Sequence, residues 1–213
     1  MKEMQVCGVY LAAGQSRRMG ENKLALPLRK STVGSMAFQA ALLSKLEHII
    51  VVTKENDCLS WMDPSFFQKP LNEKWSLARC QDVVLGQAHS LKCGLHAAQK
   101  RHPNGIMVLL ADQPFLHVKL INDLIILGEQ FQKKKDMNEI TYVAASFQGV
   151  PRPPILFLQQ AFPFLLELKG DEGARQLFQK SILKGKLLEL SDERIFFDLD
   201  TKEDYESVAN ETI

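Results

Sequence analysis

The most chemically suggestive segment spans residues 9–24, where a short apolar run leads into a loop rich in glycine and basic side chains. Gly14 and Gly20 flank an arginine pair that includes Arg18, and Lys23 follows the second glycine. Gly14 would permit a tight turn after the apolar run. Glycines let a backbone approach a ligand closely, exposed N–H groups accept an anion, and Arg or Lys neutralises its charge. The spacing is neither a Walker A motif nor the dinucleotide G-x-G-x-x-G. We therefore expect a local phosphate site, with a solvated surface loop as the alternative.

Carboxylates in two other segments could complement this loop. Asp112 follows the apolar run 106–110, and Asp198 and Asp200 alternate near the end of the chain, which would place both on one side of a strand. Carboxylate oxygens suit Mg²⁺, which binds phosphates through one or two protein carboxylates and water. The alternative is that Asp112 is a turn residue, and that Thr201 caps a final helix in a capping box with Asp204. Capping by Thr201 leaves Asp200 free to bind a metal.

Together, the loop and the carboxylates indicate one type of reaction. A basic glycine loop would hold a triphosphate, and two carboxylates from distant segments would hold Mg²⁺ across it. This arrangement suits attack on an α-phosphorus with pyrophosphate as the leaving group, because the metal and the cations neutralise the developing charge.

The elements that must position these residues alternate between buried strands and helices in the first part of the chain. This alternation predicts an α/β protein with a mostly parallel sheet and helices on both faces. Ligands of such sheets bind outside the carboxyl ends of the strands, so the loop after residue 11 and the segment after residue 110 should converge. The expected strands are 6–11, 48–53, 77–80 and 106–110, and the expected helices are one capped by Ser31 or Thr32 that reaches Leu46, then 86–100 and 116–131.

The chain after residue 135 has shorter elements and more turns. Neither an internal repeat nor a linker divides the sequence, so we expect one domain over residues 1–213. The expected elements are strands 140–144 and 155–158 around a turn-rich loop at 148–154, helices 159–168 and 172–181, strands 186–190 and 195–197, and a closing helix 201–210.

Composition excludes several classes of protein. The 213 residues carry 26 basic and 25 acidic side chains, a net charge of +1, which gives no reason to expect a nucleic-acid groove or an anionic membrane surface. No apolar run approaches the roughly 20 residues of a membrane-spanning helix, and no signal peptide is predicted. The four cysteines form no C-x-x-C pair. A cytoplasmic, reduced protein is expected.

Five ordered motifs resemble those of the MobA-like nucleotidyltransferases. The run Leu-Ala-Ala-Gly-x-Ser-x-Arg-Met-Gly-x-x-Lys-Leu-x-Leu-Pro-Leu at residues 11–28 is similar to the family signature. Within the family, the resemblance is greatest to the molybdenum cofactor cytidylyltransferases, including purine-catabolism proteins. The other similar segments are 86–95, 110–114, 170–175 and 198–204.

This resemblance implies a Rossmann-like nucleotidyltransferase fold. It also implies an Mg²⁺-dependent reaction in which the terminal phosphate of the molybdenum cofactor (molybdopterin) attacks the α-phosphorus of CTP. A xanthine dehydrogenase-type apoenzyme would be the partner that receives the product.

The resemblance also assigns roles to individual residues. Arg18, Lys23 and Asp112 would be catalytic, with Arg18 and Lys23 holding the nucleotide phosphates. Asp112 and Asp200 would bind Mg²⁺. The remaining assignments are Leu11, Ala12, Ala13, Gly14 and Ser90 as nucleotide contacts, and Asp171 and Arg175 as residues on the pterin side.

Some positions bear on the choice of substrate. Guanylyltransferases of this superfamily typically have Gly at the place of Ala13 and Asp at the place of Asn22, so both residues favour CTP over GTP. Pro153 stands where the family often has His, and Lys202 stands where Pro is usual. The first departure leaves open nucleotidyl transfer to a different phosphorylated acceptor, or a non-catalytic chaperone that inserts the cofactor. Two metal-binding carboxylates argue against a chaperone, which has no need of them.

Overall fold

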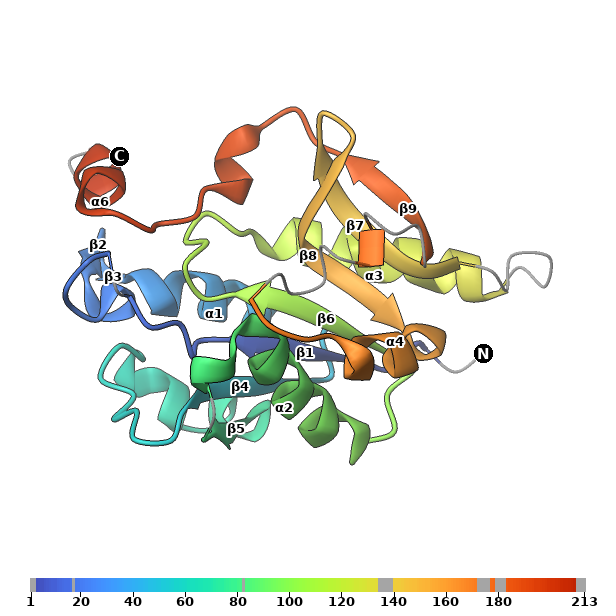
Figure 1. Ribbon diagram of the computed structural model, residues 1–213, viewed down its shortest axis with the longest axis horizontal. Helices are drawn as coiled ribbons and strands as arrows, with labels where there is room; N and C mark the ends of the chain where they lie inside the picture. The colour runs from blue at the N-terminus through green and yellow to red at the C-terminus, as the bar shows by residue number, and fades with distance from the viewer. Residues whose placement is uncertain are drawn as a thin grey trace.

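A seven-stranded sheet forms the centre of the described part of the chain, in the order β5-β4-β1-β6-β8-β7-β9 (Figure 1). The computed structural model describes residues 3–16, 18–81, 83–133, 140–171, 177–178 and 183–209. The strands of the large sheet are β1 (Val6–Leu11), β4 (His48–Lys54), β5 (Trp75–Cys80), β6 (Gly105–Leu110), β7 (Ile140–Phe147), β8 (Val150–Leu158) and β9 (Lys184–Glu189). A small ribbon pairs β2 (Pro27–Leu28) with β3 (Ser31–Thr32).

Parallel pairing dominates the half of the sheet that contains β1. This strand lies between β4 and β6 and runs parallel to both, and β5 extends the parallel set. Their continuous apolar runs fit this position, because a parallel sheet is covered on both faces. The strand β8 then runs antiparallel to β6 and β7, while β9 is parallel to β7. The predicted mostly parallel sheet is confirmed.

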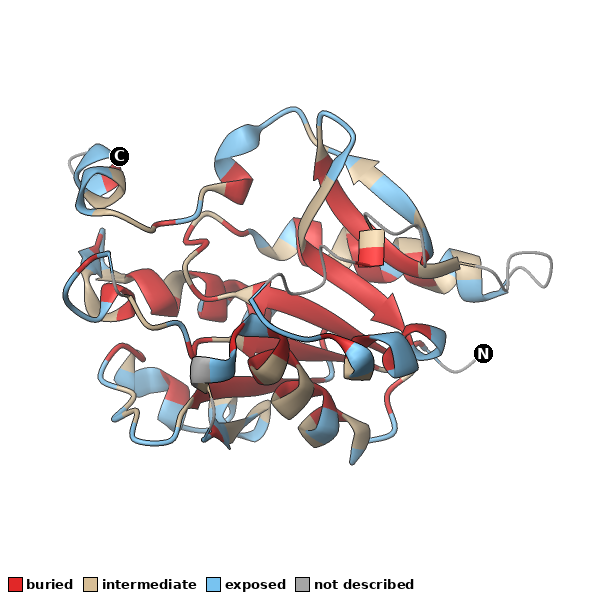
Figure 2. Cartoon of the chain, viewed as in Figure 1, coloured by how far each residue is buried: buried red, intermediate tan, exposed pale blue. Residues whose placement is uncertain are grey.

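Helices cover both faces of the sheet and create two separate cores. On one face lie α1 (Val33–Leu43) and α3 (Val118–Lys133), and on the other lie α2 (Gln87–Gln99) and α4 (Phe162–Glu167) (Figure 1). The central strands β1, β4 and β6 are almost wholly buried, whereas the edge strand β9 is largely exposed (Figure 2). A third, smaller cluster lies under α6 (Lys202–Ala209), where Leu199 and Val208 pack against Met19 and Leu28.

Three expectations about local structure were wrong. The first helix ends at Leu43, which is 62% exposed, and Leu46 reaches the core from the loop that follows. Residues 150–154 belong to β8, because Gln148 and Gly149 alone make the hairpin turn with positive φ angles of 52° and 74°. Residues 193–196 form a 3-10 turn capped by the Asp192 side chain, which accepts from the Arg194 N–H at 2.9 Å. Most of the helix expected at 172–181 lies outside the described residues.

The carboxyl ends of β1 and β6 are tied together by backbone hydrogen bonds beyond the sheet itself. The Ala111 N–H donates to the Leu11 carbonyl at 3.2 Å, and the Ala12 N–H donates to the Val52 carbonyl at 2.8 Å. The loops that follow β1 and β6 therefore start from fixed, adjacent positions. This is the edge where the sequence predicts a ligand site.

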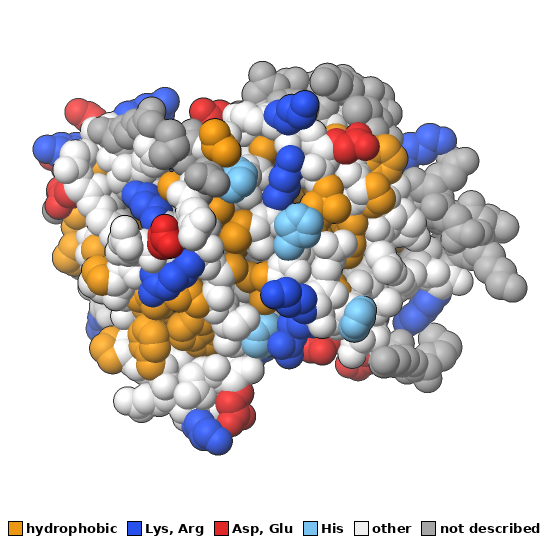
Figure 3. Space-filling model, turned by 60° about the horizontal axis from the view of Figure 1, so that its bottom comes forward, with side chains coloured by type: hydrophobic (Ala, Val, Ile, Leu, Met, Phe, Trp, Pro, Cys, Tyr) orange, Lys and Arg blue, Asp and Glu red, His pale blue; other side chains and the backbone are white. Residues whose placement is uncertain are grey.

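The outer surface carries mixed charge. On the face in Figure 3, which includes the side below the sheet in Figure 1, basic, acidic and histidine side chains are interspersed. Among the helices that the structure describes, none combines the length and the apolar character needed to cross a membrane.

Stability should depend on pH through His48, the first residue of β4. Its side chain is 5% exposed, and its Nε2 lies 2.9 Å from the Ser76 Oγ. Burial lowers the pKa of His48 to about 4, and the positive charge of Arg101 adds to this effect. In the unfolded chain the pKa of this residue is near 6.5. Between about pH 6.5 and pH 4, the unfolded chain therefore binds a proton that the folded chain does not bind.

We expect the folding equilibrium to weaken as pH falls from about 6.5 towards 4, by at most about tenfold per pH unit from this one proton. Urea unfolding of the wild type and of His48→Gln across this range measures the effect. The variant should be less sensitive to pH than the wild type. Equal pH dependence in the two proteins would contradict the assignment.

Candidate active site

An ion cluster lies at the carboxyl edge of the sheet and is centred on Lys23. The Lys23 Nζ donates to the Asp112 Oδ2 at 2.6 Å and to the Asp200 Oδ1 at 2.7 Å. These two carboxylates come from segments 88 residues apart in the chain (200 − 112). The predicted convergence of the opening loop with the two acidic segments is therefore present in the structure.

The loop delivers Lys23 to this position through local capping and burial. Lys23 begins a short 3-10 helix, Lys23–Ala25, whose cap is the Asn22 side chain that accepts from the Leu24 N–H at 3.2 Å. The Ser16 Oγ accepts from the Lys23 N–H at 3.4 Å. Leu24 is buried in the core on the α1 face, and Met19 is buried in the smaller cluster under α6. These two contacts anchor the loop. The Lys23 side chain is 8% exposed as a result.

The two carboxylates meet because the last segment is attached to the end of β6. The Leu199 N–H donates to the Asp112 carbonyl at 3.0 Å, which fixes Asp200 one residue further along. The start of α6 then holds the Asp200 backbone, because the Asp204 carboxylate accepts from the Asp200 N–H at 3.0 Å and from the Thr201 N–H at 2.7 Å. The Thr201 Oγ1 accepts in return from the Asp204 N–H at 3.1 Å. The predicted capping box is confirmed, and it leaves the Asp200 side chain free for the cluster.

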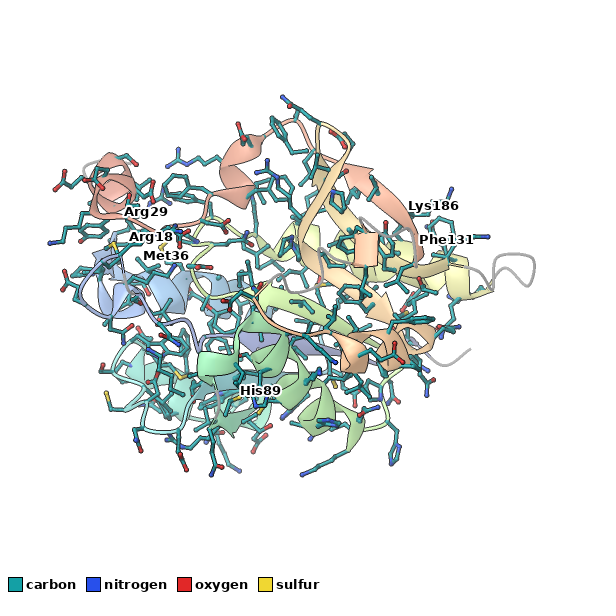
Figure 4. All side chains as sticks on the ribbon, viewed as in Figure 1. Arg18, Arg29, Met36, His89, Phe131 and Lys186 are labelled. Carbon is teal, nitrogen blue, oxygen red and sulfur yellow. The ribbon has the colours of Figure 1, made fainter. Side chains whose placement is uncertain are left out.

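Electrostatics keep Lys23 charged. Burial alone would lower the pKa of Lys23, but the Asp112 and Asp200 carboxylates outweigh it and raise that pKa above its ordinary value. Arg18 adds a second cation, with its guanidinium 3.5 Å from the Asp200 Oδ2 and its side chain 74% exposed. Figure 4 shows Arg18 on the side of the molecule where β2, β3 and α6 lie. This outer pair is screened by water, so Lys23 carries most of the attraction.

The donor set of this cluster fits a divalent cation. Asp112 and Asp200 present one oxygen each to a single positive charge at 2.6 and 2.7 Å, so a cation between them already balances their repulsion. Both are hard oxygen donors of the kind that Mg²⁺ prefers, with water and phosphate oxygens completing its shell. Within the described ranges, no group of three or more His, Cys, Asp or Glu side chains is arranged to hold a metal.

The cluster divides an open cleft into two compartments. One compartment, of about 530 Å³, lies against the opening loop and α2, and the other, of about 480 Å³, lies against β8 and the segment 196–200. Residues Leu11, Gln87, Leu110, Asp112, Asp171 and Asp200 line both. A ligand in either compartment would thus contact the same two carboxylates.

Most predicted nucleotide contacts lie in the compartment by the opening loop. Its lining includes Leu11, Ala13, Gly14, Arg18, Lys23 and Ser90. Ala12 does not line it, because its side chain packs into the core on the α1 face. The expected tight turn at Gly14 is absent, since the positive φ angles fall at Ser16 (47°) and Gly20 (74°). A Cβ at Gly14 would meet no atom within 4 Å, so only a ligand could require a glycine there.

Of the two residues predicted on the pterin side, Asp171 and Arg175, the structure describes only Asp171. Asp171 lines both compartments and lies close to the start of α2, where a Cβ on Gly86 would come within 2.5 Å of the Asp171 Oδ1. With its φ of 102°, Gly86 is required there both for conformation and for space. Arg175 lies outside the described residues. Pro153, at the place of the family's His, lines the second compartment.

The sequence patterns did not predict a role for Gln113 or its hydrogen bond to Asp198. The Gln113 side chain is 2% exposed and its Nε2 donates to the Asp198 Oδ1 at 2.8 Å. Loss of solvation, together with the charges of Asp112 and Asp200, raises the pKa of Asp198 to about 6, against the opposing effects of Gln113 and Lys23. The signal that could have identified Gln113 is its position directly after Asp112, at the end of a buried strand.

Arg152 is a further residue that sequence reasoning left without a role. It lines the second compartment, and its guanidinium lies 5.8 Å from the ring centre of Phe196, a favourable cation–π distance. A contact of 3.9 Å joins it to Glu193. The compartment therefore has a fixed positive charge at its outer wall.

Comparisons with known proteins agree with this geometry. The family described as MobA-like NTP transferase domain matches residues 8–186. The purine catabolism protein PucB of Bacillus subtilis (strain 168) is 41% identical over 210 residues, which cover 98% of each chain. A probable molybdenum cofactor guanylyltransferase of Mycobacterium avium (strain 104) is 32% identical over 133 residues, covering 60% of this chain and 59% of that protein.

The fold also matches solved structures. The structure of Rv0371c from Mycobacterium tuberculosis H37Rv in complex with manganese aligns with a TM-score of 0.70 and 21% identity, covering 98% of this chain and 100% of that chain. At this identity the likeness shows the fold alone. The family match spans both the opening loop with Lys23 and the strand that ends before Asp112, so this chain is a member of the MobA-like NTP transferase family.

Proposed function

We propose that this protein transfers CMP from CTP to the terminal phosphate of the molybdenum cofactor and releases pyrophosphate, supplying a xanthine dehydrogenase-type molybdoenzyme. The observation that carries the proposal is the meeting of Asp112 and Asp200 on Lys23, at the boundary of two compartments. A transfer reaction needs two ligands on either side of one charged centre. The names of PucB and of the guanylyltransferase relative support purine catabolism and the molybdenum cofactor, respectively.

The residues divide the work between binding and charge neutralisation. Ala13, Gly14 and Ser90 would contact CTP, while Arg18 and Lys23 would hold its phosphates. Asp112 and Asp200 would hold Mg²⁺, which when bound supplies positive charge to the phosphate oxygens. A phosphate oxygen of the acceptor forms a bond to the α-phosphorus as the bond to the bridging oxygen breaks, and pyrophosphate leaves. The acceptor would lie in the second compartment, against β8, where Asp171 would contact it. Arg175 would be a further contact.

The preference for CTP is argued from two residues. The methyl group of Ala13, which is 5% exposed, occupies space that a glycine would leave open, so a smaller pyrimidine is favoured. Asn22 caps the short helix that begins at Lys23. A guanylyl transfer is the second candidate, because the M. avium relative is named a guanylyltransferase.

Incubation with CTP, Mg²⁺ and molybdenum cofactor should give a product heavier than the cofactor by one CMP unit less water, with one pyrophosphate released per product. Mass spectrometry and a pyrophosphate assay measure these. Asp112→Asn should lower turnover by about 100-fold or more, because it removes charge at the reacting phosphate. Asp123→Asn, on the exposed face of α3, is the matched control and should retain activity. Cofactor binding without pyrophosphate release would instead identify a non-catalytic carrier.

The nucleotide preference can be measured by thermal unfolding with Mg²⁺ and each nucleotide in turn. CTP should raise the unfolding temperature more than GTP does, because stabilisation by a ligand grows with the logarithm of the ratio of its concentration to its Kd. The double variant Ala13→Gly with Asn22→Asp should reduce the difference between the unfolding temperatures measured with CTP and with GTP. Greater stabilisation of the wild type by GTP would refute the choice of CTP.

The carboxylate pair can be tested without turnover. Lys23→Met removes the buried cation between Asp112 and Asp200 and leaves only the exposed Arg18 beside Asp200, so the ligand-free variant should unfold at a lower temperature than the wild type. Mg²⁺ should then stabilise this variant more than it stabilises the wild type. Lys30→Met, at an exposed position between β2 and β3, is the control. An equal Mg²⁺ effect on all three proteins would show that the metal binds elsewhere.

A further inference from the structure

The second compartment contains a carboxylate that the Lys23 cluster does not use. Asp198 lines this compartment but not the one beside the opening loop. Neither oxygen of Asp198 is hydrogen-bonded to Lys23, whose Nζ donates to Asp112 and Asp200. Asp198 is therefore available for a ligand in the acceptor compartment.

Gln113 fixes the orientation of this carboxylate. Its buried amide donates to the Asp198 Oδ1 at 2.8 Å, and among the described residues the Oδ2 accepts no hydrogen bond. The backbone adds a second restraint, because the Leu199 N–H is bonded to the Asp112 carbonyl. The result is a carboxylate that has one oxygen anchored by Gln113 and belongs to the lining of the compartment.

The walls around Asp198 suit a flat heterocycle. Leu91, Val108, Ile155 and Phe178 give one apolar boundary, and Phe196 with Arg152 over its ring gives another. Ring systems gain from apolar and aromatic contacts on their faces, while polar atoms at their edges need specific partners. Asp198 contributes a hydrogen-bond acceptor to this compartment, so a ligand edge that carries donors fits beside it.

We propose that Asp198, oriented by Gln113, recognises the 2-amino-4-oxo-pyrimidine edge of the acceptor's pterin ring. That edge presents a ring N–H and an exocyclic NH₂ side by side, and a carboxylate pairs with both at once. This inference rests on the proposed function, because it assigns the ring of the acceptor to the second compartment. Asp198 would be a specificity-determining residue and Gln113 a positioning residue.

The test compares two small probes that differ at this edge. Pterin carries the 2-amino group, whereas lumazine carries a carbonyl oxygen at the same place, which a carboxylate repels. Quenching of probe fluorescence at neutral pH measures the affinity of the intact protein for each. The wild type should bind pterin at least about tenfold more tightly than lumazine, the size of one good bidentate pair.

Two variants separate the roles of the residues. Asp198→Asn should abolish the preference for pterin, since an amide has one acceptor oxygen and adds a donor. Gln113→Met keeps the carboxylate and should reduce the preference only in part. Stabilisation by CTP and Mg²⁺ should be unchanged in Asp198→Asn, because the nucleotide compartment does not contain Asp198.

The outcomes distinguish this inference from the proposed function. Equal binding of pterin and lumazine by the wild type would overturn the inference even if CTP binds. Loss of stabilisation by CTP and Mg²⁺ in Asp198→Asn would also overturn it, since Asp198 would then belong to the metal site. A wild type that prefers pterin but gains no stability from CTP would support the inference and count against the proposed function.

Discussion

One buried ammonium group holds the site together. Three chain segments, from the loop after β1, the end of β6 and the approach to α6, meet at Lys23. Without a cation, Asp112 and Asp200 would repel each other at the edge of the sheet. Because Lys23 lies between them, both carboxylates are attracted to its ammonium group, and this attraction links the three segments. The same attraction holds the two carboxylates on one positive charge in the ligand-free protein.

Sequence patterns predicted the parallel half of the sheet well, for a clear physical reason. Strands buried on both faces are continuous apolar runs, and their ends are sharp where the first polar residue appears, as at Asp112. The second half was predicted less well, because its elements depend on tertiary contacts. Residues 150–152 pair with β7 although Pro151 is among them, and the register shifts at Pro153 and Pro154 before pairing resumes at Ile155. Leu46 fills the core although it lies beyond the end of α1.

The site shows the same division between local and long-range information. The residue types and their position after strands were sufficient to bring Lys23, Asp112 and Asp200 into one prediction. The partner of each side chain was not predictable, because Gln113 and Asp198 are 85 residues apart and share no motif. The prediction for Gly14 was wrong about the turn itself, since Ser16 and Gly20 take the left-handed conformations. Which backbone position absorbs a bend depends on how the loop is anchored, here by Met19 and Leu24.

The attachment of the 198–200 segment to β6 also has a consequence for biosynthesis. Lys23 and Asp112 follow β1 and β6, respectively, and can approach each other as soon as these two strands have paired. Asp200 reaches them only after the ribosome has released the region that forms α6, whose capping box holds its backbone. A nascent chain that has not yet exposed this region therefore has an incomplete set of charges around Lys23.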